Sequence, residues 1–263
     1  MKYRYIGRSG LRVSPICMGT MSFGSWSDKD ESFRILEKSY DRGINFFDTA
    51  EVYPVPPTAE TVGRTEEIFG EWLQTKPRDS VLVATKVAGA ASGWFVPPIR
   101  SGLTAIDRHH IETAVEGSLR RMKIDYIDLY QVHWPDSVVP MEESMAALDR
   151  LVSAGKAPYL GTSNETAYGL TKSNVIATGG GVLSGKYNAD KFPDNARFTD
   201  YFKIENPRQR AMGERFVNDG TLGSTARYME IAREAGISPV TLATAWTTNC
   251  EFVAATIIGA RSA

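Results

Sequence analysis

Residues 43–53 read GINFFDTAEVY, and this stretch decides how the chain folds. Its largely apolar run, 44–47, has the length of a buried strand, and Asp48 closes it. A helical pattern precedes the run, with Asp28 among the residues that can start the helix and Gly43 as the residue that stops it. The stretch is therefore typical of a helix that leads into a strand covered on both faces.

The same alternation of strand and helix repeats on both sides of this stretch. Further strands are expected at 16–19, 81–85, 126–130 and 159–161, and further helices at about 61–74, 107–122 and 141–152. Such alternation predicts an α/β fold in which crossover helices link parallel strands. No G-x-G-x-x-G follows the first strand, so the sequence favours a (β/α)₈ TIM barrel over a doubly wound open sheet.

Length and composition fit one barrel domain over residues 1–263. The net charge of −1 argues against binding to nucleic acid or to an anionic membrane. Cys17 and Cys250 make no disulfide framework, and residues 1–10 lack the apolar core of a signal peptide, so we expect a soluble, cytoplasmic protein. No H-E-x-x-H or C-x-x-C occurs, so no metal site is expected; His109 and His110, at a helix start, are expected to face solvent.

Polar side chains follow three of the expected strands. They are Asp48, Tyr53, Lys86 and His133. Each alone has an ordinary structural explanation, but the loops after parallel barrel strands open on one rim, so the four can converge there. A lysine ammonium lowers the pKa of a nearby tyrosine, an aspartate holds the ammonium, and a neutral histidine can polarise a carbonyl oxygen. The set predicts a redox step in which a cofactor supplies hydride and Tyr53 supplies the proton.

Four segments carry a resemblance to a known family. Residues 43–53, 84–86, 128–135 and 159–164 resemble the aspartate–tyrosine, lysine, histidine and serine–asparagine motifs of the aldo-keto reductases. The loop 53–57 is similar to that of the Tas-like branch, which is related to the potassium-channel β subunits. The resemblance covers most of the chain and implies a (β/α)₈ barrel.

The resemblance also implies an activity and a cofactor. It implies NADPH-dependent reduction of aldehyde or ketone carbonyls to alcohols, with Tyr53 as proton donor and a small carbonyl compound as substrate. Ser163 and Asn164 would bind the nicotinamide carboxamide, and a glycine loop would wrap the pyrophosphate. Arg261 would lie near the 2′-phosphate. The full set of expected cofactor contacts is Ser163, Asn164, Gly181, Leu183, Ser184, Gly185, Lys186, Gly259 and Arg261.

Two other functions stay open. A cofactor-sensing binding protein of the channel β-subunit type would keep the same four polar residues with little turnover. A nucleotide-triphosphate-binding protein is a remote alternative, because residues 180–186 have the spacing G-x-x-x-x-G-K. That motif needs Ser or Thr next, to hold magnesium, and Tyr187 stands there instead.

The number of strands does not complete the barrel. Only six or seven strands can be placed, and the segment around 170–178 is too short for the two βα units that the family pattern has there. The closing helices after residue 263 are also missing. We expect a natural chain longer than 263 residues; a truncated family member is the alternative. An intact mass of 29.0 kDa would refute the first explanation.

Overall fold

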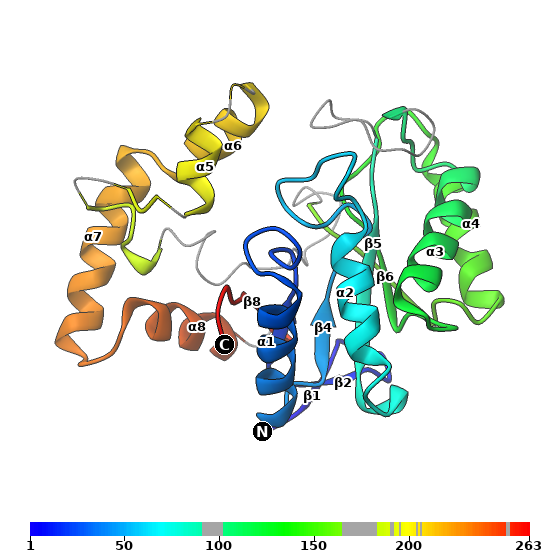
Figure 1. Ribbon diagram of the computed structural model, residues 1–263, viewed down its shortest axis with the longest axis horizontal. Coiled ribbons are helices and arrows are strands. Elements are labelled where there is room, and N and C mark those ends of the chain that lie inside the picture. Colours follow the sequence, from blue (N-terminus) through cyan, green and yellow to red (C-terminus); the bar gives the residue numbers. More distant parts are fainter. Residues whose placement is uncertain are drawn as a thin grey trace. The chain divides into compact units, whose positions relative to one another are not determined.

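The chain folds into two compact units (Figure 1). One unit comprises Met1–Asn174 with Ile257–Ala263, and the other comprises Val175–Thr256. The computed structural model describes residues 1–90, 102–164, 183–189, 192–194, 196–203, 205, 207–250 and 253–263. The prediction of one barrel domain over 1–263 stays a prediction.

A six-stranded sheet forms the centre of the first unit, in the order β7-β6-β5-β4-β3-β8. The strands are β3 (Ile16–Gly19), β4 (Phe46–Asp48), β5 (Leu82–Val87), β6 (Leu129–Val132), β7 (Tyr159–Thr162) and β8 (Thr256–Gly259). The pairs from β3 to β7 are parallel, and each strand pairs with the next strand along the chain. A separate antiparallel hairpin of β1 (Arg4–Tyr5) and β2 (Arg12–Val13) precedes the sheet.

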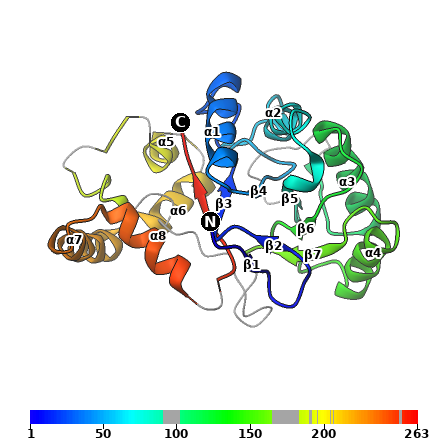
Figure 2. The ribbon, with the colours of Figure 1, turned by 90° about the horizontal axis from the view of Figure 1, so that it is seen from below.

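Four helices cover one side of this sheet. They are α1 (Lys29–Asp41), α2 (Arg64–Leu73), α3 (Arg108–Met122) and α4 (Met141–Ser153), with a short 3₁₀ turn η1 (Arg78–Ser80) before β5. Figure 2 shows the strands curving and α1 to α4 following one another along the outside. Asp28 and Asp107 cap α1 and α3 by accepting backbone N–H bonds, as their side chains predict. The α/β class and the parallel strand order are therefore confirmed.

The core lies between the sheet and these helices. Phe47 of β4 packs on Phe69 and Trp72 of α2, with ring centroids 5.7 and 5.1 Å apart. Gly70 lets α2 approach α3, because a Cβ at this position would lie 2.4 Å from Met122 Cα. Burial of this apolar layer fixes the strands, and the strands fix the site at their carboxyl ends.

Strand β6 begins at Leu129, three residues later than the expected strand at 126–130. Before Leu129, side-chain hydrogen bonds take the place of backbone hydrogen bonds between the strands. Arg78 donates to Tyr126 O, and Asp128 accepts from both Arg78 and Val83 N. The Asp128 carboxylate therefore accepts the Val83 N–H of β5, which a neighbouring strand would otherwise bind through its backbone.

The buried face of α4 is not the one that carries its largest apolar residues. Met141, Met145, Leu148 and Val152 recur at helical spacing, but only Leu148 is buried. Met141 and Met145 are 72% and 51% exposed, and the buried neighbours of Leu148 are Ala147 and Leu151. The helix is rotated relative to the face that the spacing of its largest apolar residues suggests.

Every regular element described wholly within the second unit is a helix. The helices are α5 (Arg197–Lys203), α6 (Pro207–Phe216), α7 (Asp219–Glu234) and α8 (Pro239–Asn249). Asn218 and Thr221 form a capping box at α7, and Ser238 caps α8. A cluster of aromatic rings that includes Tyr187 and Phe198 packs inside the unit. The segment around 170–178, which the sequence analysis finds too short for two βα units, lies outside the described residues.

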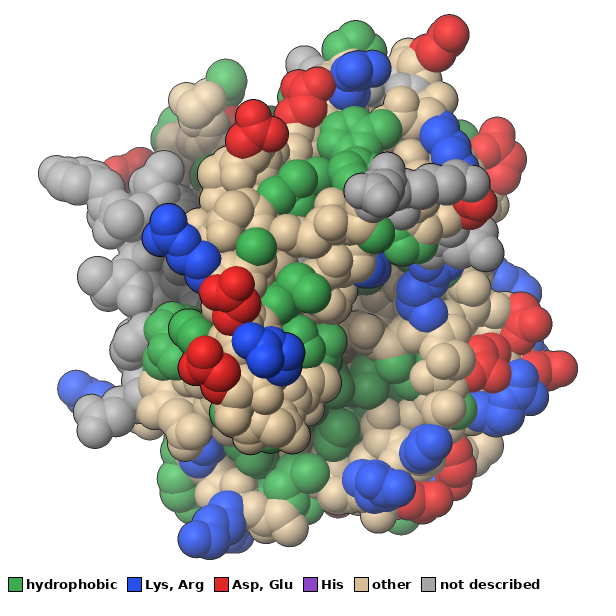
Figure 3. All heavy atoms as spheres, turned by 90° about the vertical axis from the view of Figure 1, so that its left-hand side faces the viewer, with side chains coloured by type: hydrophobic (Ala, Val, Ile, Leu, Met, Phe, Trp, Pro, Cys, Tyr) green, Lys and Arg blue, Asp and Glu red, His purple; other side chains and the backbone are tan. Residues whose placement is uncertain are grey.

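The surface carries charges of both signs. On the face shown in Figure 3, acidic and basic side chains are interspersed with apolar ones, in agreement with a net charge of −1. In the part of the chain that the structure describes, no helix combines the length and the apolar character that a membrane span requires. The same residues contain no cluster of three or more potential metal-ligating side chains.

Candidate active site

The structure brings the four polar residues to the carboxyl ends of neighbouring strands. Asp48 is the last residue of β4, Lys86 lies near the end of β5, and His133 follows β6 directly. Tyr53 lies in the loop after β4. The first residues of this loop stay beside β5, because Thr49 N donates to Ala84 O and Glu51 N to Lys86 O. The parallel register therefore places these residues on one rim, as the sequence predicts.

Lys86 and Asp48 form a buried ion pair at the centre of this group. The Lys86 ammonium donates to Asp48 Oδ1 at 2.5 Å and to Thr49 O at 2.7 Å. Gln131 Nε2 donates to the other oxygen, Asp48 Oδ2, at 3.2 Å. Asp48 and Lys86 are 5% and 3% exposed, so water does not screen the pair. Gln131, from β6, is a partner of Asp48 that the sequence analysis missed.

The pair keeps Lys86 charged. Burial by itself would lower the pKa of Lys86, but attraction to Asp48 and to Tyr53 outweighs burial, and the pKa is raised. A protonated lysine at neutral pH follows from this balance.

Tyr53 contacts both Lys86 and His133. The Lys86 ammonium lies 5.1 Å from the centroid of the Tyr53 ring. The His133 ring meets the Tyr53 ring edge-on, with centroids 5.5 Å apart and an angle of 81° between the planes. The tyrosine is half-buried, so its ring is held while part of the residue stays accessible.

His133 is neutral at physiological pH. Its pKa is lowered well below the usual 6.5, first by burial and then by the positive charge of Lys86. Its Nδ1 has no hydrogen-bond partner among the residues that the structure describes. A neutral imidazole of this kind can donate a proton in a hydrogen bond without carrying charge.

Ser163 and Asn164 lie beside His133, after β7. Ser163 N donates to Val132 O at 2.8 Å, so the chain continues the sheet register past the end of the strand. Asn164 has a positive φ of 57° and donates from Nδ2 to His133 O and to Ser163 Oγ, at 2.8 and 3.0 Å. The structure therefore brings these two predicted residues to the same rim as the four polar residues.

Gly259 and Arg261 lie at the end of β8, next to β3 in the sheet. The segment is tied to the loop after β3, because Ser22 Oγ donates to Ala260 O and Ser27 Oγ to Arg261 O. The Arg261 guanidinium lies 5.0 Å from the Trp26 ring centroid. These bonds hold a partly exposed cation at a strand end.

The remaining predicted cofactor residues belong to the second unit. Leu183, Ser184, Gly185 and Lys186 form helical and turn structure there. Gly185 has a φ of +81°, a left-handed backbone conformation that favours glycine. Gly181 lies outside the described residues.

Sequence analysis also missed the burial of two residues that contact Ala88 at the end of β5. Glu51 is 3% exposed, and burial raises its pKa to about 7. His110 is fully buried, so the expectation that it faces solvent is wrong, whereas His109 is exposed. A signal was present: His110, Ala114 and Gly117 recur at helical spacing, and all three are buried on one face of α3.

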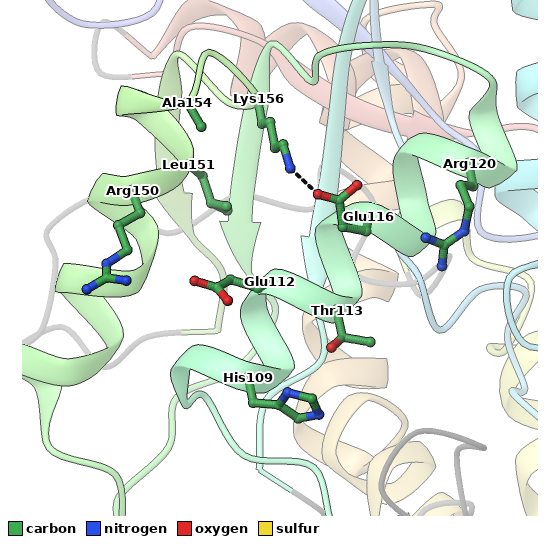
Figure 4. A pocket seen from close by; sticks show the side chains of 9 residues that line it. All are labelled: His109, Glu112, Thr113, Glu116, Arg120, Arg150, Leu151, Ala154 and Lys156. Carbon is green, nitrogen blue, oxygen red and sulfur yellow. Dashed lines mark hydrogen bonds and ion pairs between the residues drawn. The ribbon is translucent and has the colours of Figure 1, made fainter.

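A separate hollow of about 470 Å³ lies between α3 and α4 (Figure 4). His109, Glu112 and Arg150 are among its lining residues, and Lys156 pairs with Glu116 inside it. None of the residues that line it belongs to the group at the strand ends. Its glutamates Glu112 and Glu116 form ion pairs with Arg108 and Lys156 near the surface, so the hollow lacks the buried, perturbed groups that are typical of an active site.

Comparisons with known proteins identify the family. The model of the Aldo/keto reductase family matches residues 15–174. The chain belongs to this family. Protein tas of Escherichia coli (strain K12) is 31% identical over 322 aligned positions, which cover 99% of this chain and 89% of that protein. A probable voltage-gated potassium channel subunit beta of Oryza sativa subsp. japonica is 31% identical, with 99% and 87% covered. Norsolorinic acid reductase B of Aspergillus parasiticus is 35% identical over 72% of this chain and 52% of its own length.

Family membership confirms the predicted fold class and branch. The aldo/keto reductase fold is the (β/α)₈ barrel, and the curved parallel sheet described above is consistent with part of it. The alignment with protein tas spans 322 positions, more than the 263 residues of the chain. That relative therefore has residues inside the aligned region with no counterpart here. This agrees with the strand count, which leaves the barrel incomplete.

Proposed function

We propose that the protein reduces aldehyde or ketone carbonyls to alcohols with NADPH, and that Tyr53 donates the proton. The observation that carries the proposal is the buried Lys86–Asp48 pair in contact with the Tyr53 ring. The family supports the redox part of the proposal, because one relative is named as a reductase.

Lys86 supports proton transfer from Tyr53. When the hydroxyl gives up its proton to the substrate oxygen, a phenolate forms, and the nearby ammonium stabilises that negative charge. Asp48 keeps the ammonium charged and in place despite its burial. Because the charges are buried, their interaction is stronger than it would be in water.

His133 supplies polarity without charge. As a neutral imidazole in contact with the Tyr53 ring, it can orient the substrate oxygen by a hydrogen bond. A protonated His133 would place a second positive charge near Lys86, and the low pKa of His133 prevents this.

The residues present fit the expected cofactor. Ser163 and Asn164 together supply a hydroxyl and an amide, which can both donate to and accept from a carboxamide. Arg261 offers a guanidinium suited to a phosphate. Gly181, Leu183, Ser184, Gly185, Lys186 and Gly259 stay cofactor contacts that are proposed from the sequence alone. When bound, NADPH supplies the hydride.

A cofactor-sensing role is the second candidate. Two plant relatives named as probable channel β subunits cover 99% of this chain at 31% and 30% identity. Such a protein would bind NADPH stably, turn over carbonyls negligibly and co-purify with a membrane channel. Rapid turnover of a simple aldehyde would favour the reductase.

The experiment is a fluorescence titration with NADPH followed by turnover with a panel of aldehydes and ketones. Tyr53→Phe should bind NADPH like the unmodified protein and lose turnover. Tyr5→Phe is the matched control, because Tyr5 is 60% exposed in β1. Full turnover by Tyr53→Phe would refute the assignment of the proton donor.

A further inference from the structure

Two buried side chains, from the loop after β4 and from α3, bind the backbone of one residue, Ala88. Glu51 Oε1 accepts from Ala88 N at 2.5 Å, and His110 Nε2 lies 3.1 Å from Ala88 O. Since a carbonyl oxygen only accepts, His110 Nε2 must carry the proton that it donates. Ala88 directly follows β5 and stands two residues after Lys86, while Glu51 stands two residues before Tyr53.

The two clamping groups are enclosed. Glu51 and His110 are 3% and 0% exposed, and Glu51 Oε1 lies 3.6 Å from His110 Nε2. Glu51 Oε2 has no hydrogen-bond partner within the described residues. Its neighbour Glu66 differs, because it accepts from both Thr85 and Arg121. A buried carboxylate with one strong bond is costly, so a purely structural need for an acceptor would be met better by glutamine.

We propose that Glu51 and His110 are positioning residues, which hold the end of β5 with Lys86 against the loop that carries Tyr53. We call the contacts of Glu51 and His110 with Ala88 the clamp. The proposal depends on the proposed function only in that Tyr53 is the proton donor. Without Glu51, the Ala88 N–H has no acceptor and the loop after β4 loses this bond to β5. Tyr53 would then sample positions away from Lys86, and turnover would fall while NADPH binding stayed the same.

The charge of Glu51 changes in the neutral range. Burial raises its pKa to about 7, the bond from Ala88 opposes the rise, Glu66 adds to it and Arg121 opposes it. The titratable and charged groups around it are Glu66 of α2, His110 and Arg121 of α3, and Tyr130 of β6. Ionised Glu51 binds the Ala88 N–H more strongly, so the clamp tightens as the pH rises through 7.

The test compares Glu51→Gln, Glu51→Ala and the control Glu116→Gln. Glu116 is an exposed glutamate on α3 whose charge is paired with Lys156. Amide hydrogen exchange of Ala88 and residues 49–56 measures the clamp without any turnover. The kcat with NADPH and 4-nitrobenzaldehyde, measured from pH 5.5 to 8.5, and the Kd of NADPH measure its effect on the reaction.

The clamp predicts that Glu51→Ala raises the exchange rate of the Ala88 amide at least about tenfold and lowers kcat, with the Kd of NADPH within about twofold. The ratio of kcat between the unmodified protein and Glu51→Gln should rise across pH 7, because glutamine cannot ionise. Glu116→Gln should change none of these values.

A second pair of variants guards against simple unfolding. His110→Gln keeps an N–H donor and should retain more activity than His110→Leu at equal circular dichroism. Unchanged Ala88 exchange in Glu51→Ala, or a kcat ratio that is constant from pH 5.5 to 8.5, would overturn the clamp. An unmodified protein without turnover would refute the proposed function alone, because the exchange of Ala88 would still decide the clamp.

Discussion

The Lys86 ammonium and the Asp48 carboxylate lie 2.5 Å apart, and both residues are almost fully buried. Two strands supply them, β5 and β4, so the pair depends on the sheet register and also reinforces it. Removing the two charges from water is costly, and the Lys86 ammonium lies 5.1 Å from the centroid of the Tyr53 ring, where the proposed proton transfer would use its charge.

Replacing Asp48 tests whether the pair keeps Lys86 charged. In Asp48→Asn the burial of Lys86 is no longer offset, so its pKa should fall. We expect a loss of about 3–5 kcal/mol in the free energy of unfolding at pH 7, and a fall in kcat of at least about tenfold. Urea unfolding and steady-state kinetics measure these quantities.

The control for this change is Glu67→Gln, which breaks an exposed pair with Arg64 and should cost less than about 1 kcal/mol. Equal stability losses in the two variants would contradict the account of the buried pair. Because the pKa of Lys86 is raised in the folded state, this contribution to stability is present at pH 7 and is lost only at strongly alkaline pH.

The low pKa of His133 predicts that the free energy of unfolding depends on pH in the acid range. Its pKa in the folded protein lies well below 6.5, so the unfolded chain binds more protons as the pH drops. The free energy of unfolding should therefore decrease below pH 6.5, by up to about 1.4 kcal/mol for each pH unit, until the folded pKa is reached. In His133→Gln this part of the slope should be missing. Urea unfolding between pH 4 and 7 would show it, and identical slopes would argue against a neutral, buried His133.

Arg261 predicts the preference between the two nicotinamide cofactors. If its guanidinium binds the 2′-phosphate, Arg261→Ala should weaken NADPH about 10- to 100-fold and leave NADH nearly unchanged. The Kd values of both cofactors, measured by fluorescence for the two proteins, give the ratio. A ratio that does not move counts against this role.

Gly70 tests the packing of α2 on α3. In Gly70→Ala the new Cβ would lie 2.4 Å from Met122 Cα, which is backbone and cannot rotate away. We expect a loss of about 1–3 kcal/mol, although alanine favours helices over glycine by about 1 kcal/mol. Gly223→Ala in α7 is the control, since nothing lies within 4 Å of its Cβ. Thermal unfolding should separate them, and a Gly70→Ala protein as stable as the parent would contradict the close approach.

The sequence was sufficient to predict the group around Tyr53. Asp48, Lys86 and His133 each follow a strongly apolar run, and parallel strands bring their carboxyl ends to one rim whatever the loops do. The caps Asp28 and Asp107 were equally readable, because a cap is a local interaction.

Interactions that depend on tertiary packing could not be predicted from the sequence. Glu51 has nothing in its local pattern to show that it meets Ala88, 37 residues later. The start of β6 was misplaced because Arg78 and Asp128 satisfy its backbone by side chains. The helix at 141–152 was predicted, but its buried face could not be read from its largest apolar residues, since Met141 is exposed.

The measurement that tests the central claim most directly is single-turnover oxidation of bound NADPH by 4-nitrobenzaldehyde, in the unmodified protein and in Tyr53→Phe. The account predicts rapid oxidation in the first. In the second it predicts a rate at least about 100-fold lower, with an unchanged Kd of NADPH. An equal rate in both proteins would contradict it, because a phenylalanine has no proton to donate.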